Sequence, residues 1–153
     1  MVIKKIAVIG AGLMGHGITQ AVAQTINCDV YMQDVKQGFI DKGMMQIKNN
    51  LNRRLEKKEI SPAEVKQVLS RIHPVTDLKE AVTNADIIIE AVTENREVKE
   101  ALIAEIDKIA APTAYIASNT SSIRISELAL ATKRPEKFAG MHFFNPPQSM
   151  KLI

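Results

Sequence analysis

A glycine pattern near the N-terminus constrains the fold more than any other feature of this chain. Three glycines follow directly after an apolar, β-branched run, residues 3–9, which predicts a buried strand. In such a turn the first glycine permits the tight bend, the second lets a phosphate approach the backbone, and the third lets the next helix pack closely. The loop predicted to hold the pyrophosphate of a dinucleotide is Gly10-Ala11-Gly12-Leu13-Met14-Gly15.

The residues after the glycines strengthen this interpretation. A helix is predicted for residues 13–25 and a short strand for residues 29–33, which completes a parallel βαβ unit. Asp34 ends that strand, about 20 positions after the glycines, where an acidic side chain accepts hydrogen bonds from the adenosine ribose and repels the 2′-phosphate of NADP. NAD is therefore the predicted cofactor. The alternative is that Asp34 only caps the next helix.

A helical hairpin is predicted over residues 36–71. Apolar residues recur at helical intervals between residues 36 and 57, and Ser61, Pro62 and Glu64 are typical of the start of a second helix that runs to residue 70. Such a hairpin is an insertion in a minimal doubly wound sheet, so we expect it to cover the far end of the ligand.

The rest of the chain continues the alternation of strands and helices. Strands are predicted at residues 73–75, 86–89, 114–117 and 138–142, with helices near 95–110 and 124–131. The chain has no repeat or long linker, so we predict a single domain over residues 1–153. Its fold class is α/β: a doubly wound, mostly parallel Rossmann sheet with the inserted hairpin.

Composition excludes several classes of function. The longest apolar runs are far shorter than a membrane span, and no signal peptide is apparent, so we expect a cytoplasmic protein without a membrane partner. The lone Cys28 excludes an intramolecular disulfide and a thiolate metal site, and no metal is predicted. A net charge of +3 with few aromatic residues does not favour nucleic acid.

Basic residues nevertheless gather in the predicted hairpin. A cluster of this kind is typical of a solvated helix face, and the alternative is a site for an anionic ligand. The residues are Lys48, Arg53, Arg54, Lys57 and Lys58.

Polar residues follow the later strands, at the sheet edge where open α/β sheets bind ligands. Taken singly, each group has an ordinary interpretation as a helix cap or a turn. His142 is the most informative, because histidine exchanges protons near neutral pH and so suits reaction with an alcohol, whereas we interpret His16 and His73 as structural. The groups are Glu90 with Glu94, residues 118–121, and His142 with Asn145.

Four runs of the sequence resemble the NAD-binding domain of the 3-hydroxyacyl-CoA dehydrogenases, and they occur in the same order as in that family. The resemblance extends over essentially the whole chain. The runs are residues 10–18, residues 90–95 with Val98 and Lys99, residues 118–122, and residues 141–146.

The resemblance implies a reversible oxidation of 3-hydroxyacyl-CoA to 3-ketoacyl-CoA, in fatty acid β-oxidation or butyrate-type metabolism. Hydride passes to NAD and the hydroxyl proton passes to a histidine, which His142 matches. By the same match, Ser121 hydrogen-bonds the reacting oxygen of the acyl-CoA beside the nicotinamide, while Glu94, Lys99 and Asn145 contact the nicotinamide side of the cofactor. Lys57 falls near a family lysine that meets the CoA phosphates.

The resemblance also implies parts beyond residue 153. In the family, a glutamate that orients the histidine follows the strand begun by residues 150–153, and a helical C-terminal domain closes over the acyl chain and forms a homodimer. We therefore expect the 153-residue chain to be a fragment that binds NAD but lacks the full active site.

Two other interpretations remain open. An L-gulonate-type dehydrogenase of the same superfamily shares the glycine turn and the histidine loop, but the cationic hairpin favours CoA, whose phosphates need such partners. A non-catalytic NAD-binding module is possible because a fold alone does not prove a function. The presence of His142 and Ser121 argues against that module.

Overall fold

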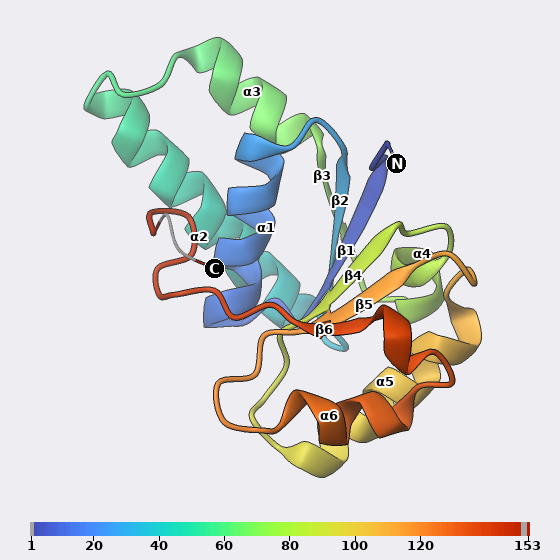
Figure 1. Cartoon of the computed structure of the whole chain (residues 1–153). Helices are drawn as coiled ribbons and strands as arrows, with labels where there is room; N and C mark the ends of the chain where they lie inside the picture. The colour runs from blue at the N-terminus through green and yellow to red at the C-terminus, as the bar shows by residue number, and fades with distance from the viewer. Residues whose placement is uncertain (1, 151–152) are drawn as a thin grey trace.

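The computed structural model, which describes residues 2–150 and Ile153, contains one parallel sheet of six strands in the order β3-β2-β1-β4-β5-β6 (Figure 1). Every neighbouring pair of strands is parallel. The predicted doubly wound Rossmann fold is confirmed. The strands are β1 (Lys5–Ile9), β2 (Asp29–Gln33), β3 (Ile72–Val75), β4 (Ile87–Glu90), β5 (Tyr115–Ser118) and β6 (Phe138–Gly140).

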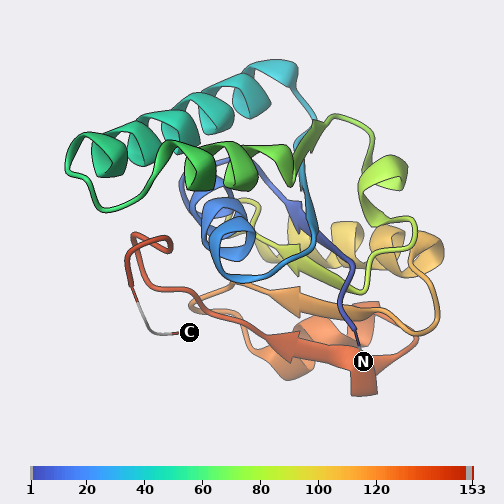
Figure 2. The same ribbon diagram turned by 90° about the horizontal axis from the view of Figure 1, so that it is seen from above.

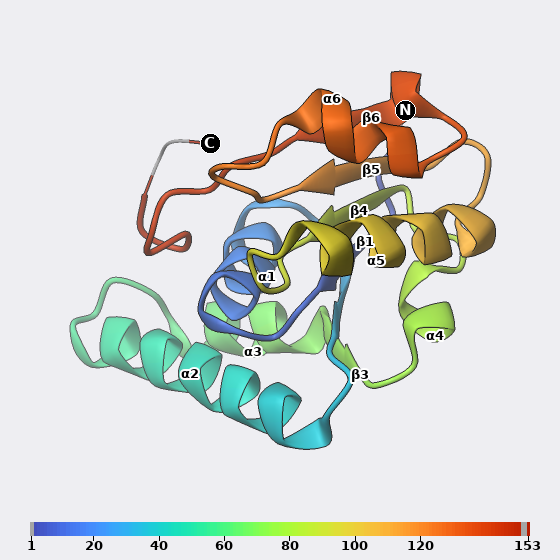
Figure 3. The same cartoon turned by 90° about the horizontal axis from the view of Figure 1, so that it is seen from below.

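Helices cover both faces of the sheet (Figures 1 and 3). Residues 6–9 of strand β1 are all apolar because both of its faces are covered: Ile6 and Val8 belong to the core cluster on one face, and Ala7 and Ile9 to the cluster on the other. One face carries α1 (Leu13–Thr25), α2 (Gln37–Glu56) and α3 (Pro62–Ser70), and the other carries α4 (Leu78–Val82), α5 (Arg96–Ile109) and α6 (Ile125–Leu128).

The predicted hairpin is present as α2 and α3, which lie side by side beyond α1 (Figure 2). Helix α3 begins with the predicted capping box: the Ser61 hydroxyl accepts from the Glu64 amide, and the Glu64 carboxylate accepts from the Ser61 amide. The hairpin buries Ile47 and Leu51 in the same core cluster as α1. That packing explains the apolar stripe, while its predicted cover of a ligand stays a prediction.

The sequence missed one helix, and one predicted strand boundary was wrong. The five-residue helix α4 was not predicted because it is too short for an apolar periodicity, although Asp77 caps it by accepting from the Lys79 amide. Strand β6 ends at Gly140 rather than at His142. Its neighbour β5 ends at Ser118, whose carbonyl accepts from the Met141 amide, and the Phe143 amide then donates to the Asn119 side chain in the loop that follows β5.

Two short 3-10 turns, Ala129–Ala131 and Pro135–Lys137, complete the connections between α6 and β6. None of the helices in the described part of the chain is long and apolar enough to span a bilayer.

Candidate functional site

The glycine loop between β1 and α1 requires glycine at two positions. Gly10 has φ +105°, and a Cβ there would lie 2.6 Å from the Ala91 carbonyl oxygen. A Cβ at Gly15 would lie 1.7 Å from the Gly10 carbonyl oxygen, so α1 could not approach β1. Gly12 differs, because it is exposed and a Cβ there would meet nothing within 4 Å. The loop is therefore tight on its inner side and open at Gly12.

The open side of the loop is also the N-terminus of α1. Gly12 is the N-cap residue and has no side chain that could accept a hydrogen bond, and the first turn of α1 holds no acidic residue. The backbone amides of that turn can therefore donate to a ligand. The carbonyl of Gly12 accepts from the His16 amide and lies 2.7 Å from His16 Nδ1, on the helix side. Ala11 is buried and Leu13 is exposed. This arrangement fits a pyrophosphate.

Asp34 lies directly after β2 and reaches the same loop. Its Oδ2 accepts a hydrogen bond from the Ala11 amide at 2.8 Å. It does not cap α2, whose N-cap residue is Lys36. Asp34 thus ties the end of β2 to the glycine loop, and its contact with a ribose stays a prediction.

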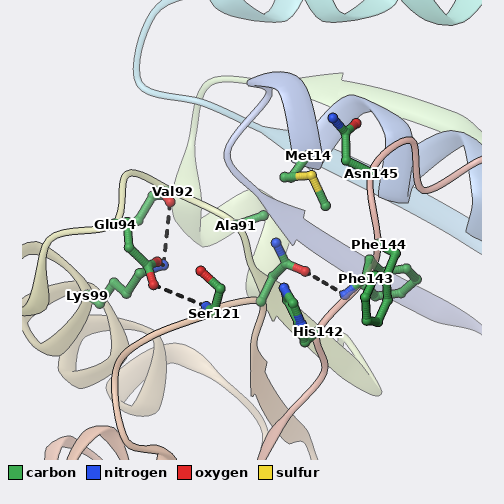
Figure 4. Close-up of a pocket in the computed structure, with 11 residues that line it drawn as sticks. Met14, Ala91, Val92, Glu94, Lys99, Ser121, His142, Phe143, Phe144 and Asn145 are labelled. Carbon is green, nitrogen blue, oxygen red and sulfur yellow. Dashed lines mark hydrogen bonds and ion pairs between the residues drawn. The ribbon is translucent and has the colours of Figure 1, made fainter. Parts of the chain in front are cut away.

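A cavity of about 320 Å³ opens beside the glycine loop, at the carboxyl ends of the strands (Figure 4). It lies where the strand order reverses between β1 and β4, which is the usual ligand crevice of such sheets. Glu94, Lys99 and Ser121 lie on one side of it, opposite His142 and Phe144. The structure brings together in this pocket the predicted residues Met14, Glu94, Lys99, Ser121, His142 and Asn145.

Glu94 anchors the loop that carries Ser121. Its Oε1 accepts from the Thr120 hydroxyl at 2.6 Å, from the Ser121 amide at 3.1 Å, and from the amide and hydroxyl of Ser122 at 3.2 and 2.9 Å. Burial raises the pKa of Glu94, but these hydrogen bonds and the charge of Lys99 outweigh it and lower the pKa to about 2. Glu94 is therefore a carboxylate that holds Ser121 at the pocket.

Lys99 lines the pocket and takes part in a buried ion pair. Its side chain is 1% exposed, with Nζ 2.6 Å from Glu90 Oε1 and 3.3 Å from Glu94 Oε2. Glu90 is fully buried and also accepts from the Val92 amide and the Ser118 hydroxyl. The sequence predicts Glu90 only as one of two acidic residues near a strand end, because nothing in it pairs Glu90 with Lys99.

His142 lies in the loop after β6 and is exposed to the pocket. Its ring lies 5.2 Å from that of Phe144, centroid to centroid. The neighbouring Phe143 anchors the loop, since its side chain is buried and its amide donates to Asn119 Oδ1 at 2.8 Å. The sequence does not predict this contact of Asn119, whose only signal is its place in the polar run after β5.

Lys57 does not reach this pocket. It is exposed at the end of α2 and lines a second cavity of about 1070 Å³, together with Arg54 and Arg71. Phe143 lines both cavities. The other cationic residues Lys48, Arg53 and Lys58 are exposed, as on a solvated helix face. Among the described residues, no cluster of three or more potential metal ligands occurs.

We compared the sequence with models of known protein families. The model of the family described as "3-hydroxyacyl-CoA dehydrogenase, NAD binding domain" matches residues 5–153. The chain belongs to this family. The predicted resemblance and the predicted cofactor NAD are thereby confirmed, and the residues at the glycine loop and the pocket fit a dinucleotide.

Relatives of this NAD-binding domain are longer proteins. A probable 3-hydroxybutyryl-CoA dehydrogenase of Deinococcus radiodurans is 44% identical, over 97% of this chain and 52% of that protein. The fatty acid oxidation complex subunit alpha of Acinetobacter baumannii is 42% identical, over 99% of this chain and 21% of that protein. The crystal structure of 3-hydroxybutyryl-CoA dehydrogenase from Escherichia coli has a TM-score of 0.94 at 36% identity, over 99% of this chain and 32% of that one. The chain thus spans from about a fifth to about half of these relatives.

Proposed function

We propose that this chain is the NAD-binding part of an enzyme that oxidises 3-hydroxyacyl-CoA to 3-ketoacyl-CoA. One observation carries the proposal: a single pocket joins the start of α1, at Met14, to His142 and Ser121. A cofactor bound along the glycine loop would then extend into a pocket that already holds a proton acceptor and a hydroxyl group. The names of the relatives, which are 3-hydroxybutyryl-CoA dehydrogenases and fatty acid oxidation subunits, support the same substrate class.

The cofactor would bind across the switch point of the sheet. The open backbone at Gly12 and the amides of α1 would hold the pyrophosphate. Asp34 uses Oδ2 for the Ala11 amide, which leaves Oδ1 to accept from the adenosine ribose. The nicotinamide would then enter the pocket beside Glu94 and Lys99. When bound, NAD supplies the hydride acceptor.

The protein residues would manage the proton of the substrate alcohol. His142 would take the proton from the 3-hydroxyl group, and the hydroxyl of Ser121 would hydrogen-bond the same oxygen. Glu94 fixes the backbone of Ser121 and so holds its side chain at the pocket where the substrate oxygen would lie. Asn145, on the loop after β6, would contact the nicotinamide side of the cofactor.

CoA would extend away from this pocket toward the helical hairpin. Lys57, Arg54 and Arg71 line one cavity together with Glu59 and Glu64. Arg54 pairs with Glu59, so Lys57 and Arg71 would supply the positive charge that CoA phosphates require. Phe143 lines both cavities, which supports a path for the acyl-pantetheine arm between them. A cytoplasmic location and a homodimeric whole enzyme belong to the same proposal.

A substitution at His142 tests the chemistry. In the whole enzyme, His142→Ala should lower kcat for acetoacetyl-CoA by orders of magnitude while the Kd for NAD stays similar. The matched control is His73→Ala. The ring of His73 stacks on Tyr31 and pairs with Asp29 at the start of β2. Unchanged turnover in His142→Ala would remove this histidine from the mechanism.

A comparison of substrates distinguishes the proposed function from the two alternatives, an L-gulonate-type dehydrogenase and a non-catalytic NAD-binding module. Turnover of acetoacetyl-CoA well above turnover of L-gulonate supports the CoA substrate, and Lys57→Ala should then raise KM for the CoA substrate alone. The reverse preference would make this a gulonate-type dehydrogenase. NAD binding without turnover of either substrate would leave the non-catalytic module.

A further inference from the structure

The charges at the nicotinamide end of the pocket do not cancel. Lys99 Nζ lies between two carboxylates, 2.6 Å from Glu90 and 3.3 Å from Glu94. One positive and two negative groups leave a net charge of −1. We call Glu90, Lys99 and Glu94 the charge triad.

The hydrogen bonds around the charge triad indicate that both acids are ionised. Glu90 accepts from the Lys99 ammonium, the Val92 amide and the Ser118 hydroxyl. Ser118 Oγ itself accepts from the Thr120 amide, which directs its own proton toward Glu90. Glu94 likewise accepts from the hydroxyls and amides of residues 120–122. A carboxylate surrounded by donors is in its charged form.

The charge triad lies at the wall of the pocket. Lys99 and Glu94 both line the pocket, and Glu90 lies directly behind Lys99 with no exposed surface. Glu90 and Lys99 are buried and poorly screened by water, and Glu94 is partly screened, so the net charge acts on whatever enters the pocket.

We propose that the charge triad makes the pocket favour the oxidised cofactor, whose nicotinamide ring is cationic, over the reduced cofactor, whose ring is neutral. The inference rests on the proposed function, which sets the nicotinamide in this pocket. A net charge of −1 beside the ring stabilises the cationic form and leaves the neutral form nearly unaffected. The remainder of the cofactor is the same in both, so the ratio of the two affinities isolates the effect on the ring.

The test measures the Kd of NAD⁺ and of NADH for the 153-residue chain by calorimetry. Glu90→Gln changes the net charge of the triad from −1 to 0 and should raise the ratio Kd(NAD⁺)/Kd(NADH) roughly tenfold. Glu94→Gln makes the same change of charge at a side chain that is 40% exposed, so its shift should have the same sign and be smaller.

Two further variants separate net charge from loss of a contact. Glu90→Gln with Lys99→Gln removes one charge of each sign and restores −1, so the ratio should return near its original value. Glu105→Gln removes an exposed charge from the same helix and should leave the ratio unchanged. Thermal melting and circular dichroism report which variants fold, and if Glu90→Gln does not fold, Glu94→Gln and the double variant decide.

The outcomes distinguish this inference from the proposed function. An unchanged ratio in Glu94→Gln and Glu90→Gln, with both cofactors still bound, overturns the inference and leaves the proposed function standing. A double variant shifted as far as Glu90→Gln also overturns it. An original chain that binds neither cofactor overturns the proposed function and, with it, the inference.

Discussion

The glycine loop and the pocket beside it are two halves of one ligand site, built in different ways. The loop is formed by the backbone of a single stretch of chain. Gly10 and Gly15 can pack closely there because they carry no side chain. The pocket is formed by side chains from the loops after β4, β5 and β6 and from helices α1 and α5, and several of them are joined by hydrogen bonds and ion pairs.

This difference determines how each half can fail. The loop tolerates almost no added volume on its inner side, since the atoms opposite Gly10 and Gly15 are backbone and cannot move aside. The pocket depends instead on the ion pair of Glu90 with Lys99, because both side chains are buried and removal of either one leaves a buried charge without that partner. An added methyl group should therefore damage the loop most, and a removed charge should damage the pocket most.

The largest effect is expected at Gly15. Gly15→Ala sets a Cβ 1.7 Å from the Gly10 carbonyl oxygen, so α1 must move away from β1, and we expect a loss of more than about 4 kcal/mol in the free energy of unfolding. Denaturant titration measures it. The control is Gly38→Ala in the first turn of α2, where a Cβ would meet nothing within 4 Å and stability should hold or rise slightly. Equal stability of the two variants would contradict the close approach of α1.

The next effect is expected at Lys99. Lys99→Met leaves the buried carboxylate of Glu90 without its cation, which should cost about 3–5 kcal/mol of unfolding free energy. Adding Glu90→Gln should recover most of that loss, because the unpaired charge is then gone. Lys108→Met, at an exposed position on the same helix, is the control. Full stability of Lys99→Met alone would show that the ion pair does not hold the pocket together.

Gly12 separates the ligand-binding role of the loop from its folding role. Gly12→Ala should leave the unfolding free energy within about 0.5 kcal/mol, because φ is −69° and the space around its Cβ is open. The same methyl group would stand where the pyrophosphate approaches, so the Kd for NAD should rise roughly tenfold or more. Calorimetry measures the Kd. An unchanged Kd would move the phosphate site away from Gly12.

The smallest effect is expected at Glu94 and depends on pH. Its pKa is lowered from 4.5 to about 2 in the folded chain, so its stabilisation is fully present above about pH 4.5 and is lost as the pH falls toward 2. The unfolding free energy should therefore fall less steeply over this window in Glu94→Gln than in the original chain. Because Glu94 is partly exposed, the difference should stay below about 1 kcal/mol. Identical slopes would contradict a lowered pKa.

Much of the fold was predictable because its signals are local. The βαβ unit from β1 to β2, the hairpin of α2 and α3, and the alternation of strands and helices all follow from apolar periodicity, glycines and caps. The exceptions are short or lie at an edge: α4 has five residues, and β6 ends as soon as its neighbour β5 ends.

The residues of the site were more predictable than the hydrogen bonds and ion pairs between them. The sequence indicated Glu94, Ser121 and His142 as polar groups at strand ends, and the structure brings them into one pocket. It did not indicate that Asn119 binds the amide of Phe143, or that Glu90 pairs with Lys99. The first contact joins the loops after β5 and β6 and is defined only when these strands lie next to each other, and the second depends on how α5 packs against the end of β4.

By itself, the sequence determined the sheet, the glycine loop and the kind of ligand, since these depend on residues close together in the chain and on backbone geometry that only glycine allows. Tertiary structure decided how the later residues are used. It buried one lysine between two carboxylates, made Glu94 the anchor of Ser121, and left Lys57 at a separate cavity. The physical reason is that ion pairs and hydrogen bonds between loops depend on distances that only the packed sheet defines.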